Sequence, residues 1–559
     1  MNKNRILLAL ILFSFITTYS REMKIKVYPK RIHSIDHRIF GHFLERPSWG
    51  GEFGIEDAVI NNNGDLDPRV IKKLKKLKIP VLRFPGGTDV DYMDWTDMID
   101  LPEREKRPVS IGNTGDTVTN YFGYDEFAEL TGELDCESII PINFFDAFLK
   151  RIPLDSAAIH NVGLLAYTNA EKGQKLPDGM RDWPSIRLQN GYDSPHNIKY
   201  IQIVNDTWVL WQWKQELLEK DNLKNPYKWY VKCVARYLEL IEKIDPNVRI
   251  IVDHIDEKMT NKLIEAFGDR IDYFVFHSYL PWEVNNENTA RNGKDILVEN
   301  LDKEEVWNAM VGVPNKLNRD EMSLIGSPLI KIAEKEDLKV AVTEWNWNGW
   351  WQPELNPPLK SVYAHAVGVA GFLHGMLRSA NVIKMGCQSM LVGSSWGITG
   401  IRVDKEGNTA PYYLPTSQMT SFYAKHHGKH LLDAELDNVP VYNQPLKLAG
   451  IEPKDKVAYI DFLPTGSKER LALFFINRDL TNNRKVIINL ASFTNLNFSG
   501  QLSILTGVLE NEKVTPPQDK YLSKINKQIE IKNQECSFEL PARSVSVLEI
   551  SMDEGRIFE

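Results

Sequence analysis

A chain of 559 residues is longer than one average domain and leaves room for a large barrel and a smaller module. Hydrophobic residues make up 43% of the chain and charged residues 25%, which is ordinary for a globular protein. The net charge of −8 and the lack of a long Lys/Arg block argue against a surface that binds polyanions, so we do not expect nucleic acid as a partner.

The first twenty residues have the layout of an export signal. A basic start is followed by an apolar stretch at 6–16 and by the small residues Thr18 and Ser20. The apolar stretch is shorter than the roughly 20 residues that span a bilayer, and no Cys follows it to carry a lipid. We therefore expect residues 1–20 to be a signal peptide, no membrane anchor, and export to the periplasm or the extracellular space.

Residues 21–35 precede the repeating pattern of the main domain. Within them, apolar and polar residues alternate from Met23 to Tyr28, as in a strand with one buried face. We expect this strand to pair into the C-terminal domain, so that both ends of the chain contribute to one domain.

From residue 36 to residue 405, short apolar strands alternate with helical patterns, which indicates βαβ units. Eight such strands predict a closed (β/α)8 barrel of the TIM type rather than an open sheet. The strands are expected at residues 40–44, 81–84, 138–143, 199–204, 249–252, 273–277, 339–343 and 382–390.

Helix signals lie between these strands. Asp67 followed by Pro68 is an N-cap with a proline in the first turn, and the apolar residues after it recur at helical spacing with lysines on the opposite face. A second helix is expected at 227–244, before an Asp-Pro pair. A third is expected at 362–377, where small apolar residues predict tight packing against the barrel.

After residue 405 the pattern changes to strand runs separated by turns. This predicts an all-β antiparallel sandwich over residues 406–559. Its strands are expected at 457–462, 471–477, 485–490, 501–505 and 545–550.

The cysteines show neither CxxC pairing nor metal-ligand spacing with histidine. A chain of this size does not need a disulfide framework. We interpret all four as isolated core thiols: Cys136, Cys233, Cys387 and Cys536.

Polar and ionisable residues recur where the predicted barrel strands end, the face that carries the reactive residues of such barrels. Asp206 follows the strand at 199–204 and Glu344 follows the strand at 339–343. Glycoside cleavage needs two carboxyl groups, because one protonates the leaving oxygen while the other attacks or stabilises the anomeric carbon. The other strand ends carry Glu45, Arg83, Asn143, Asn205, His277 and Tyr279.

Glu344 is the stronger candidate of the two carboxylates. It lies among bulky aromatics, since Trp345-Asn346-Trp347 follows it directly. We expect a structural glutamate here to need an arginine partner, and a nucleophile to need only hydrogen bonds from neighbours such as His277 and Tyr279. On this basis Glu344 is interpreted as the nucleophile.

Several motif stretches occur in one order along nearly the whole chain after the signal, at residues 39–45, 81–87, 122–127, 190–206, 277–279, 344–346, 475–478 and 540–545. Together they resemble family 51 of the glycoside hydrolases, the α-L-arabinofuranosidases. The resemblance implies a retaining hydrolase with Glu344 as nucleophile and Asp206 in the acid/base position, which requires neither a metal ion nor another cofactor.

The resemblance also implies the substrate class. Such enzymes act on arabinofuranosyl side chains of plant-type polysaccharides such as arabinan and arabinoxylan, or on their oligosaccharides, and they often form homo-oligomers. From the strand ends and the resemblance together, we expect substrate contacts from Glu45, Arg83, Thr88, Asn143, Asn205, His277, Tyr279 and Trp347.

Departures from the family pattern cluster at the site. The acid/base is a glutamate in the family and is Asp206 here, which withdraws the carboxyl group by on the order of 1.5 Å. A misplacement of about 1 Å can cost on the order of a hundredfold in rate. The other departures are Arg46 for His, Thr88 for Asn or Cys, Thr343 for Asp, and Met390 for Gln, with Gln388 as a replacement for the last.

These departures leave three readings open. The chain can be an arabinofuranosidase in which Asp206 acts, or in which another carboxylate (Glu52, Glu216 or Glu283) takes its place. It can be a hydrolase of a different glycan on the same scaffold, or a non-catalytic carbohydrate-binding protein that keeps the cleft.

Overall fold

Eight parallel strands form the core of the main domain: β2 (Gly41–Phe43), β3 (Val81–Arg83), β6 (Glu137–Ile142), β7 (Tyr200–Ile203), β8 (Arg249–Asp253), β9 (Tyr273–Tyr279), β12 (Val340–Asn346) and β13 (Ile383–Gln388). They close into a barrel in the order β12-β13-β2-β3-β6-β7-β8-β9. Each lies where the sequence predicts a strand, so the (β/α)8 barrel is confirmed.

The structure is a computed structural model. It describes residues 22–46, 59, 65–112, 115–205, 225–253, 256–312, 327–348, 355, 358–359, 362–394, 398–404, 409–494, 496–507, 509 and 521–551. The expected signal peptide at 1–20 and the expected acid/base Asp206 lie outside these residues.

Helices surround the barrel: α2 (Pro68–Leu77), α3 (Tyr124–Leu134), α4 (Phe145–Phe148), α5 (Leu154–Asn169), α6 (Trp183–Gln189), α8 (Pro226–Ile244), α9 (Glu257–Phe267), α10 (Lys303–Val311), α11 (Ser327–Glu336), α12 (Val362–Arg378) and α13 (Pro415–His426). The three helices predicted from sequence are α2, α8 and α12. In α2 the carboxylate of Asp67 accepts the Arg69 N–H at 2.8 Å, and the four buried side chains recur at helical spacing. Within the described residues, no helix is both long and apolar enough to cross a membrane.

Short elements lie in the connections between barrel strands and in the chain before β2 and after β13. The 3-10 turns are η1 (His37–Phe40), η2 (Thr88–Asp91), η3 (Trp95–Met98), η4 (Gly268–Arg270) and η5 (Val298–Asn300). The two-residue strands are β4 (Ser110–Ile111), β5 (Thr117–Val118), β10 (Ala290–Arg291), β11 (Lys294–Asp295), β14 (Val392–Gly393), β15 (Ile401–Arg402), β16 (Tyr412–Tyr413) and β19 (Leu446–Lys447).

The last helix of the barrel lies beyond the predicted domain boundary at residue 405. Helix α13 packs against α12 and α2 and buries Met419, Phe422 and Tyr423. It follows β13 in the chain as the other helices follow their strands, so the barrel extends to His426. Turn-rich sequence and the short strands β14, β15 and β16 separate α13 from β13, which obscures the pattern in the sequence.

The C-terminal domain is built on one nine-stranded sheet in the order β25-β24-β27-β22-β21-β17-β1-β23-β26. Its strands are β1 (Met23–Ser34), β17 (His430–Asp437), β21 (Ile460–Gly466), β22 (Arg470–Asn477), β23 (Arg484–Asn489), β24 (Ser499–Gly507), β25 (Leu522–Glu530), β26 (Glu535–Leu540) and β27 (Ser544–Ser551). The rings of Phe475 on β22 and Phe538 on β26 lie 5.5 Å apart, although four strands separate them in the sheet. The sheet therefore folds over its own core, so that two parts of it face each other as in the predicted sandwich.

One predicted strand of this domain is two strands in the structure. The run 457–462 covers the end of β20 (Lys454–Ala458) and the start of β21. β20 pairs with β18 (Val441–Gln444), whereas β21 joins the nine-stranded sheet, so the chain changes partners at Tyr459.

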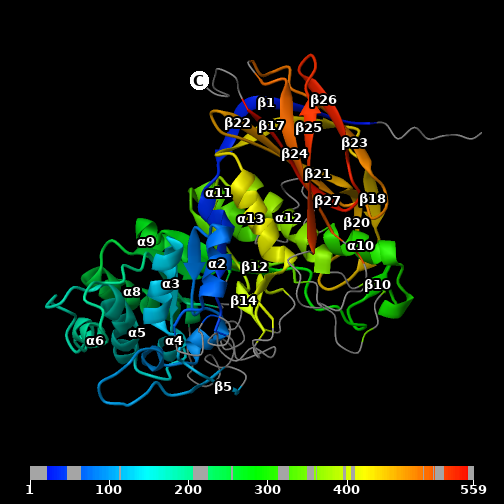
Figure 1. The fold of residues 1–559 in the computed structure, drawn as a ribbon. Coiled ribbons are helices and arrows are strands. Elements are labelled where there is room, and N and C mark those ends of the chain that lie inside the picture. Colours follow the sequence, from blue (N-terminus) through cyan, green and yellow to red (C-terminus); the bar gives the residue numbers. More distant parts are fainter. Residues whose placement is uncertain are drawn as a thin grey trace, which may run out of the picture.

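The N-terminal strand lies inside the C-terminal sheet, as the alternation from Met23 predicts. β1 pairs antiparallel with β17, with Ile25 opposite Leu436, and parallel with β23, with Ile25 opposite Ile488. In Figure 1 the blue β1 runs beside the orange and red strands of the chain's other end. Met23, Ile25 and Val27 are buried in the core of that domain.

A buried ionic network joins the barrel helices to this sheet. Asp461 on β21 accepts from Arg478 Nη2 at 2.8 Å and from Arg378 on α12, and its Oδ1 lies 3.0 Å from His374 Nδ1. The hydroxyl of Tyr423 on α13 contacts His374 Nε2 at 2.8 Å. Burial alone would raise the pKa of Asp461, but Arg378, His374 and Arg478 together hold it well below its ordinary value.

The cysteines are free thiols, as predicted: Cys233, Cys387 and Cys536 are buried, and Cys136 is partly buried. Burial raises the pKa of each thiol to about 12, so all four stay neutral at physiological pH.

Candidate active site

Glu344 projects into the barrel because its strand is irregular. Ala341 on β12 lines the barrel interior, and strict alternation would point a residue three positions later to the outside. The register with β9 shifts between Ala341 and Glu344, so that Glu344 pairs with His277. Such a bulge re-aims a side chain, a use that is common next to active sites. The carboxylate thereby reaches residues across the interior.

Both oxygens of the Glu344 carboxylate are held. Oε1 accepts from Arg83 Nη1 at 2.8 Å, and Oε2 accepts from the Tyr279 hydroxyl at 3.1 Å. His277 Nδ1 lies 3.6 Å from Oε2, and its Nε2 contacts the Thr343 hydroxyl at 3.0 Å. Glu344 is only 6% exposed, so the carboxylate has one fixed orientation in a nearly dry site.

Glu344 has an arginine partner, which we expected of a structural glutamate and not of a nucleophile. Arg83 comes from the end of β3, and its charge-assisted hydrogen bond with Glu344 spans the barrel mouth. The arginine does not mark the glutamate as merely structural, because it approaches one oxygen and leaves the other to the hydroxyl of Tyr279.

Arg83 also ties Glu344 to the end of β7, where the second carboxylate is expected. Its Nε donates to Gln202 Oε1 at 3.0 Å, and its Nη2 donates to Asn205 Oδ1. The guanidinium is fully buried and lies over the Phe43 ring at 4.6 Å. Because Nε, Nη1 and Nη2 each donate to a protein group and the guanidinium is buried, Arg83 fits a positioning role; its direct contact with substrate stays a prediction.

The end of β7 has a strained backbone. Val204 has φ +71°, a left-handed conformation that is costly for a β-branched residue. Gln202 Nε2 donates to the Val204 carbonyl at 3.0 Å, and Arg83 binds the next residue, Asn205. The left-handed residue breaks the strand alternation, which lets the Asn205 side chain turn to Arg83.

Asn205 is the last described residue before the expected acid/base. It is fully buried, and within the described part of the chain its Nδ2 has no hydrogen-bond partner. A buried amide donor without a partner is costly in an empty site, and a sugar hydroxyl would satisfy it. Asp206 itself lies outside the described residues, so its role stays a prediction.

Glu45 lies at the same mouth, after β2. A Cβ atom on Gly87 would come within 2.1 Å of Glu45 Oε1, and one on Gly86 within 2.7 Å of Arg83 Nη1. Both glycines have positive φ, +48° at Gly86 and +69° at Gly87. The Pro-Gly-Gly turn therefore presses onto the two side chains in a way that only glycine permits.

Two predicted substrate contacts have side chains bound inside the protein. Trp347 is 2% exposed, and its indole donates to the Met310 carbonyl at 3.0 Å, so no face is available to a sugar. Asn143 is buried before α4, where it donates to Asp146 Oδ2 at 3.0 Å and accepts the Asp146 N–H at 3.2 Å; its contact with substrate stays a prediction. Thr88 begins η2, one residue after Gly87, and its contact with substrate stays a prediction.

The structure shows which groups contact three of the residues involved in the departures from the family pattern. Thr343 holds His277 through its hydroxyl. Arg46 is buried, and its Nη1 lies 3.7 Å from Met93 Sδ. Gln388 does not replace the expected glutamine, because its amide contacts Asn346 at 3.3 Å and Thr420 at 2.6 Å inside the protein.

Two residues were not predicted from sequence. Gln202 is a polar side chain inside an otherwise apolar strand run, a signal that could have marked it. Trp282 follows β9 by three residues and is 49% exposed, with its ring 5.8 Å from that of Tyr279. The position of Trp282 near Tyr279 depends on the loop conformation, which the sequence pattern does not reveal.

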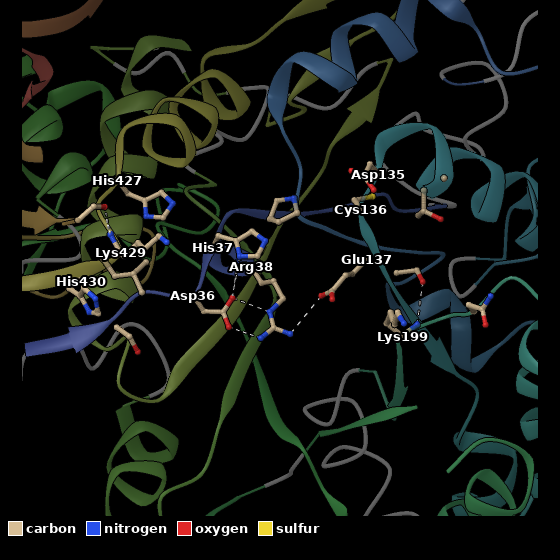
Figure 2. Close-up of a pocket in the computed structure, with 18 of the residues that line it drawn as sticks. Asp36, His37, Arg38, Asp135, Cys136, Glu137, Lys199, His427, Lys429 and His430 are labelled. Carbon is tan, nitrogen blue, oxygen red and sulfur yellow. Dashed lines mark hydrogen bonds and ion pairs between the residues drawn. The ribbon is translucent and has the colours of Figure 1, made fainter. Parts of the chain in front are cut away.

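A large cavity lies at the opposite end of the barrel. It has a volume of about 1270 Å³ and is lined by residues at or just before the starts of strands, such as Glu137 and Lys199. Figure 2 shows Arg38 bound to Asp36 and close to Glu137 in this cavity. Cations and anions there neutralise one another, and Glu344 is at the far end of its strand, so the cavity is not the candidate site. Across the described residues, no cluster of three or more His, Cys, Asp or Glu side chains is placed to hold a metal ion.

Two family models match the chain. The Alpha-L-arabinofuranosidase 1 domain matches residues 73–295, and the Alpha-L-arabinofuranosidase C-terminal domain matches residues 344–544. Together they cover most of the barrel, including Arg83, Asn205, Tyr279 and Glu344, and most of the C-terminal sheet.

Individual relatives agree with the family models. The chain is 23% identical over 491 residues to the intracellular exo-α-(1→5)-L-arabinofuranosidase of Halalkalibacterium halodurans, covering 83% of this chain and 86% of the relative. It is 30% identical over 236 residues to α-L-arabinofuranosidase C of Emericella nidulans, 41% of each chain. The crystal structure of α-L-arabinofuranosidase from Thermotoga maritima with arabinose has a TM-score of 0.69 at 20% identity, covering 95% of this chain and 100% of the other, which shows the same fold.

Proposed function

The chain belongs to the α-L-arabinofuranosidase family 51 of the glycoside hydrolases, and we propose that it is a retaining, exo-acting α-L-arabinofuranosidase. Its substrates would be arabinan, arabinoxylan or their oligosaccharides, from which it releases arabinofuranosyl residues. The observation that carries the proposal is Glu344, which a register shift turns into the barrel mouth and which Arg83 and Tyr279 hold in place.

In the first step Glu344 acts as the nucleophile. Its carboxylate attacks the anomeric carbon while the bond from that carbon to the glycosidic oxygen breaks. Asp206, protonated beforehand, gives its proton to the departing oxygen, so the aglycone leaves as a neutral alcohol and the arabinosyl group becomes an ester of Glu344.

In the second step Asp206 acts as a base. Its carboxylate takes a proton from a water molecule whose oxygen attacks the anomeric carbon, and the ester bond to Glu344 breaks. Both carboxyl groups return to their starting forms, and arabinose leaves with its original anomeric configuration.

The neighbouring residues support these roles by geometry. Arg83 and Tyr279 fix the two oxygens of Glu344, so little reorganisation is needed before attack. Asn205 offers its amide donor to a sugar hydroxyl, and Glu45, packed on Gly87, offers carboxylate oxygens to others.

Hydrolysis of an aryl α-L-arabinofuranoside by purified Glu344→Gln tests the nucleophile. We expect loss of at least 1000-fold in kcat with unchanged thermal unfolding. Glu283→Gln is the comparison variant, because Glu283 is a half-buried carboxylate on the loop after β9 and another candidate for the acid. Wild-type rates in Glu344→Gln would refute the assignment, and inactivation by Glu283→Gln would point to that residue as the acid.

Asp206→Ala tests the acid/base. Without a proton donor, substrates with poor leaving groups should slow far more than activated aryl glycosides, which depart without protonation. Equal slowing of both would indicate a purely positional role. The anomeric configuration of the first-formed product, followed by NMR, separates retention from inversion.

Two rival functions lead to different results in the same assays. A hydrolase of another glycan would release no arabinose from arabinan but would cleave a different aryl glycoside. A non-catalytic protein would bind arabino-oligosaccharides in calorimetry without product. The curated relatives named as arabinofuranosidases support the proposed activity over both.

Export and self-association are further parts of the proposal. The relative from Halalkalibacterium halodurans is named intracellular, whereas this chain begins with a basic and then apolar stretch typical of a signal peptide. Fractionation of the expressing cells and sequencing of the mature N-terminus would test export. Sedimentation analysis would test the expected homo-oligomer.

A further inference from the structure

The cavity at the opposite end of the barrel from Glu344 lies between the barrel and the C-terminal sheet. One side, the barrel wall, comes from residues at or before the starts of β2, β3, β6 and β7 and from the end of α3. The other side, the sheet wall, consists of His427, Lys429, His430, Ser467 and Arg470. The volume of about 1270 Å³ exceeds the roughly 300–1000 Å³ of a small-molecule site, so it can hold several sugar rings.

The barrel wall carries the carboxylates of the described lining, which are Asp36, Asp135 and Glu137. Arg38 Nε donates to Asp36 at 3.0 Å, and its Nη1 lies 3.6 Å from Glu137. Glu137 also accepts the Tyr200 hydroxyl at 2.9 Å. Carboxylates have more acceptor sites than these contacts fill, so this wall offers acceptors to the hydroxyl groups of a ligand.

The sheet wall differs in charge, because its described residues include cations and imidazoles but no carboxylate. Arg470 pairs with Glu549, which lies outside the lining, and donates to the His427 carbonyl at 3.2 Å, so it holds this segment in place. Lys429 is exposed, and no ion pair links its ammonium to a described carboxylate. This wall therefore has a positive charge to offer to an anion.

Figure 2 shows how the two kinds of group are separated. His427, Lys429 and His430 lie together on one side of Arg38, and Glu137 and Lys199 lie on the other. A ligand that fits both walls presents a negative group to the first set and hydroxyl groups to the second. A sugar acid has both, whereas a simple anion lacks the hydroxyl groups and a neutral sugar leaves Lys429 unpaired.

We propose that this cavity binds an oligosaccharide of sugar acids, with carboxylates toward the sheet wall and hydroxyl groups toward the barrel wall. The site goes beyond the proposed function, because the length of the barrel separates it from Glu344. An acidic chain bound here leaves the mouth at Glu344 open. The protein can then be held on an acidic polymer while it acts on a neutral one.

The imidazoles make this binding depend on pH. Burial lowers the pKa of His427 and of His430, so both are neutral at pH 7.5. The charged or titratable groups that act on these two rings are His37, Arg31, Lys429 and Arg470. None of them is an anion, so a bound carboxylate favours protonation of both rings. Sugar carboxyls with a pKa near that of Asp, about 4, stay ionised at pH 5, so binding should tighten as the pH falls.

Calorimetry with trigalacturonate and with its fully methyl-esterified form tests the site. We expect one trigalacturonate per chain, a Kd at least tenfold lower at pH 5 than at pH 7.5, and at least tenfold weaker binding of the neutral ester. Lys429→Glu should raise the Kd at pH 5 at least tenfold, and the milder Lys429→Gln should raise it less. Lys527→Glu is the matched control, because Lys527 is an exposed lysine on the edge strand β25, and it should keep the wild-type Kd. Thermal unfolding checks that each variant is folded.

Each other outcome overturns a definite statement. Absence of binding at pH 5 would overturn the site, and an equal Kd for the ester would overturn the role of the carboxylates. Inorganic phosphate that binds as tightly as trigalacturonate would show a site for a small anion and overturn the sugar. A wild-type Kd in both Lys429 variants would overturn the assignment to this cavity. Arabinose release is measured separately, because its absence would overturn the proposed function and leave this site unaffected.

Discussion

Replacing Gln202 by Met tests whether the end of β7 is held in place by its neighbours. Gln202 accepts from Arg83 Nε and donates to the Val204 carbonyl, both at 3.0 Å and both buried. Methionine keeps the approximate volume but removes both hydrogen bonds. Because the change leaves a guanidinium N–H and a carbonyl unpaired, at about 1–3 kcal/mol each, we expect the free energy of unfolding to fall by about 2–4 kcal/mol.

The effect on catalysis follows from the strain at Val204. Its left-handed backbone stores roughly 1–3 kcal/mol, and without Gln202 the strand end can relax and carry Asn205 and Asp206 with it. A displacement of about 1 Å costs on the order of a hundredfold. We therefore expect kcat to fall 10- to 100-fold with little change in KM, and to fall most for poor leaving groups, which depend on Asp206.

The assay measures kcat and KM on aryl glycosides of graded leaving-group pKa, together with urea unfolding. Asn477→Leu is the control, because Asn477 is also a buried amide that donates to backbone carbonyls, at 3.0 Å and 2.9 Å, but lies in the C-terminal sheet. It should lose stability and keep kcat. If Gln202→Met likewise keeps wild-type kcat, the argument that this contact positions the strand end fails.

Three further predictions concern other contacts. Asp461→Asn should lower the free energy of unfolding by about 3–5 kcal/mol, since it leaves buried cations without their counter-charge; a urea midpoint equal to wild type would contradict this. Stability should fall as the pH drops below about 6.5, because burial lowers the pKa of His42 to about 3 and those of His365 and His374 to about 4. The unfolded chain then binds up to three more protons, about 4 kcal/mol per pH unit, and a flat profile from pH 7 to pH 4.5 would refute it. Tyr279→Phe should lower kcat 10- to 100-fold, since it removes a hydrogen bond of about 1.5–3 kcal/mol to an ionised carboxylate; an unchanged kcat on methyl arabinofuranoside would exclude that role.

The barrel was predictable because buried parallel strands are short, apolar and regularly spaced. The strand ends follow from the same pattern, so Glu344, Arg83, Asn205 and Tyr279 could be assigned to one mouth before any contact was known. Their close contacts confirm that assignment.

The contacts themselves were not predictable, because they depend on irregularities. The register shift before Glu344 and the left-handed Val204 each reverse the direction of a side chain, and neither has a residue pattern that announces it. Trp347 shows the converse error: adjacency to Glu344 in sequence does not place it at the opening, and its indole is buried against Met310. The sandwich was predictable from the strand runs, but the strand order that joins its two faces in one hydrogen-bonded sheet was not, because strand runs do not specify which strands pair.

The place of β1 has a consequence for the order of assembly. Its neighbours β17 and β23 begin at His430 and Arg484, both far later in the chain than Ser34, where β1 ends. Until those segments have been synthesised, Met23–Ser34 has no strand to pair with, and such long-range closure is slow. Once they are present, β1 lies between the β25–β17 half and the β23–β26 half of the sheet and is hydrogen-bonded to both. A strand near the start of the chain thus joins the two parts of the domain that is synthesised last.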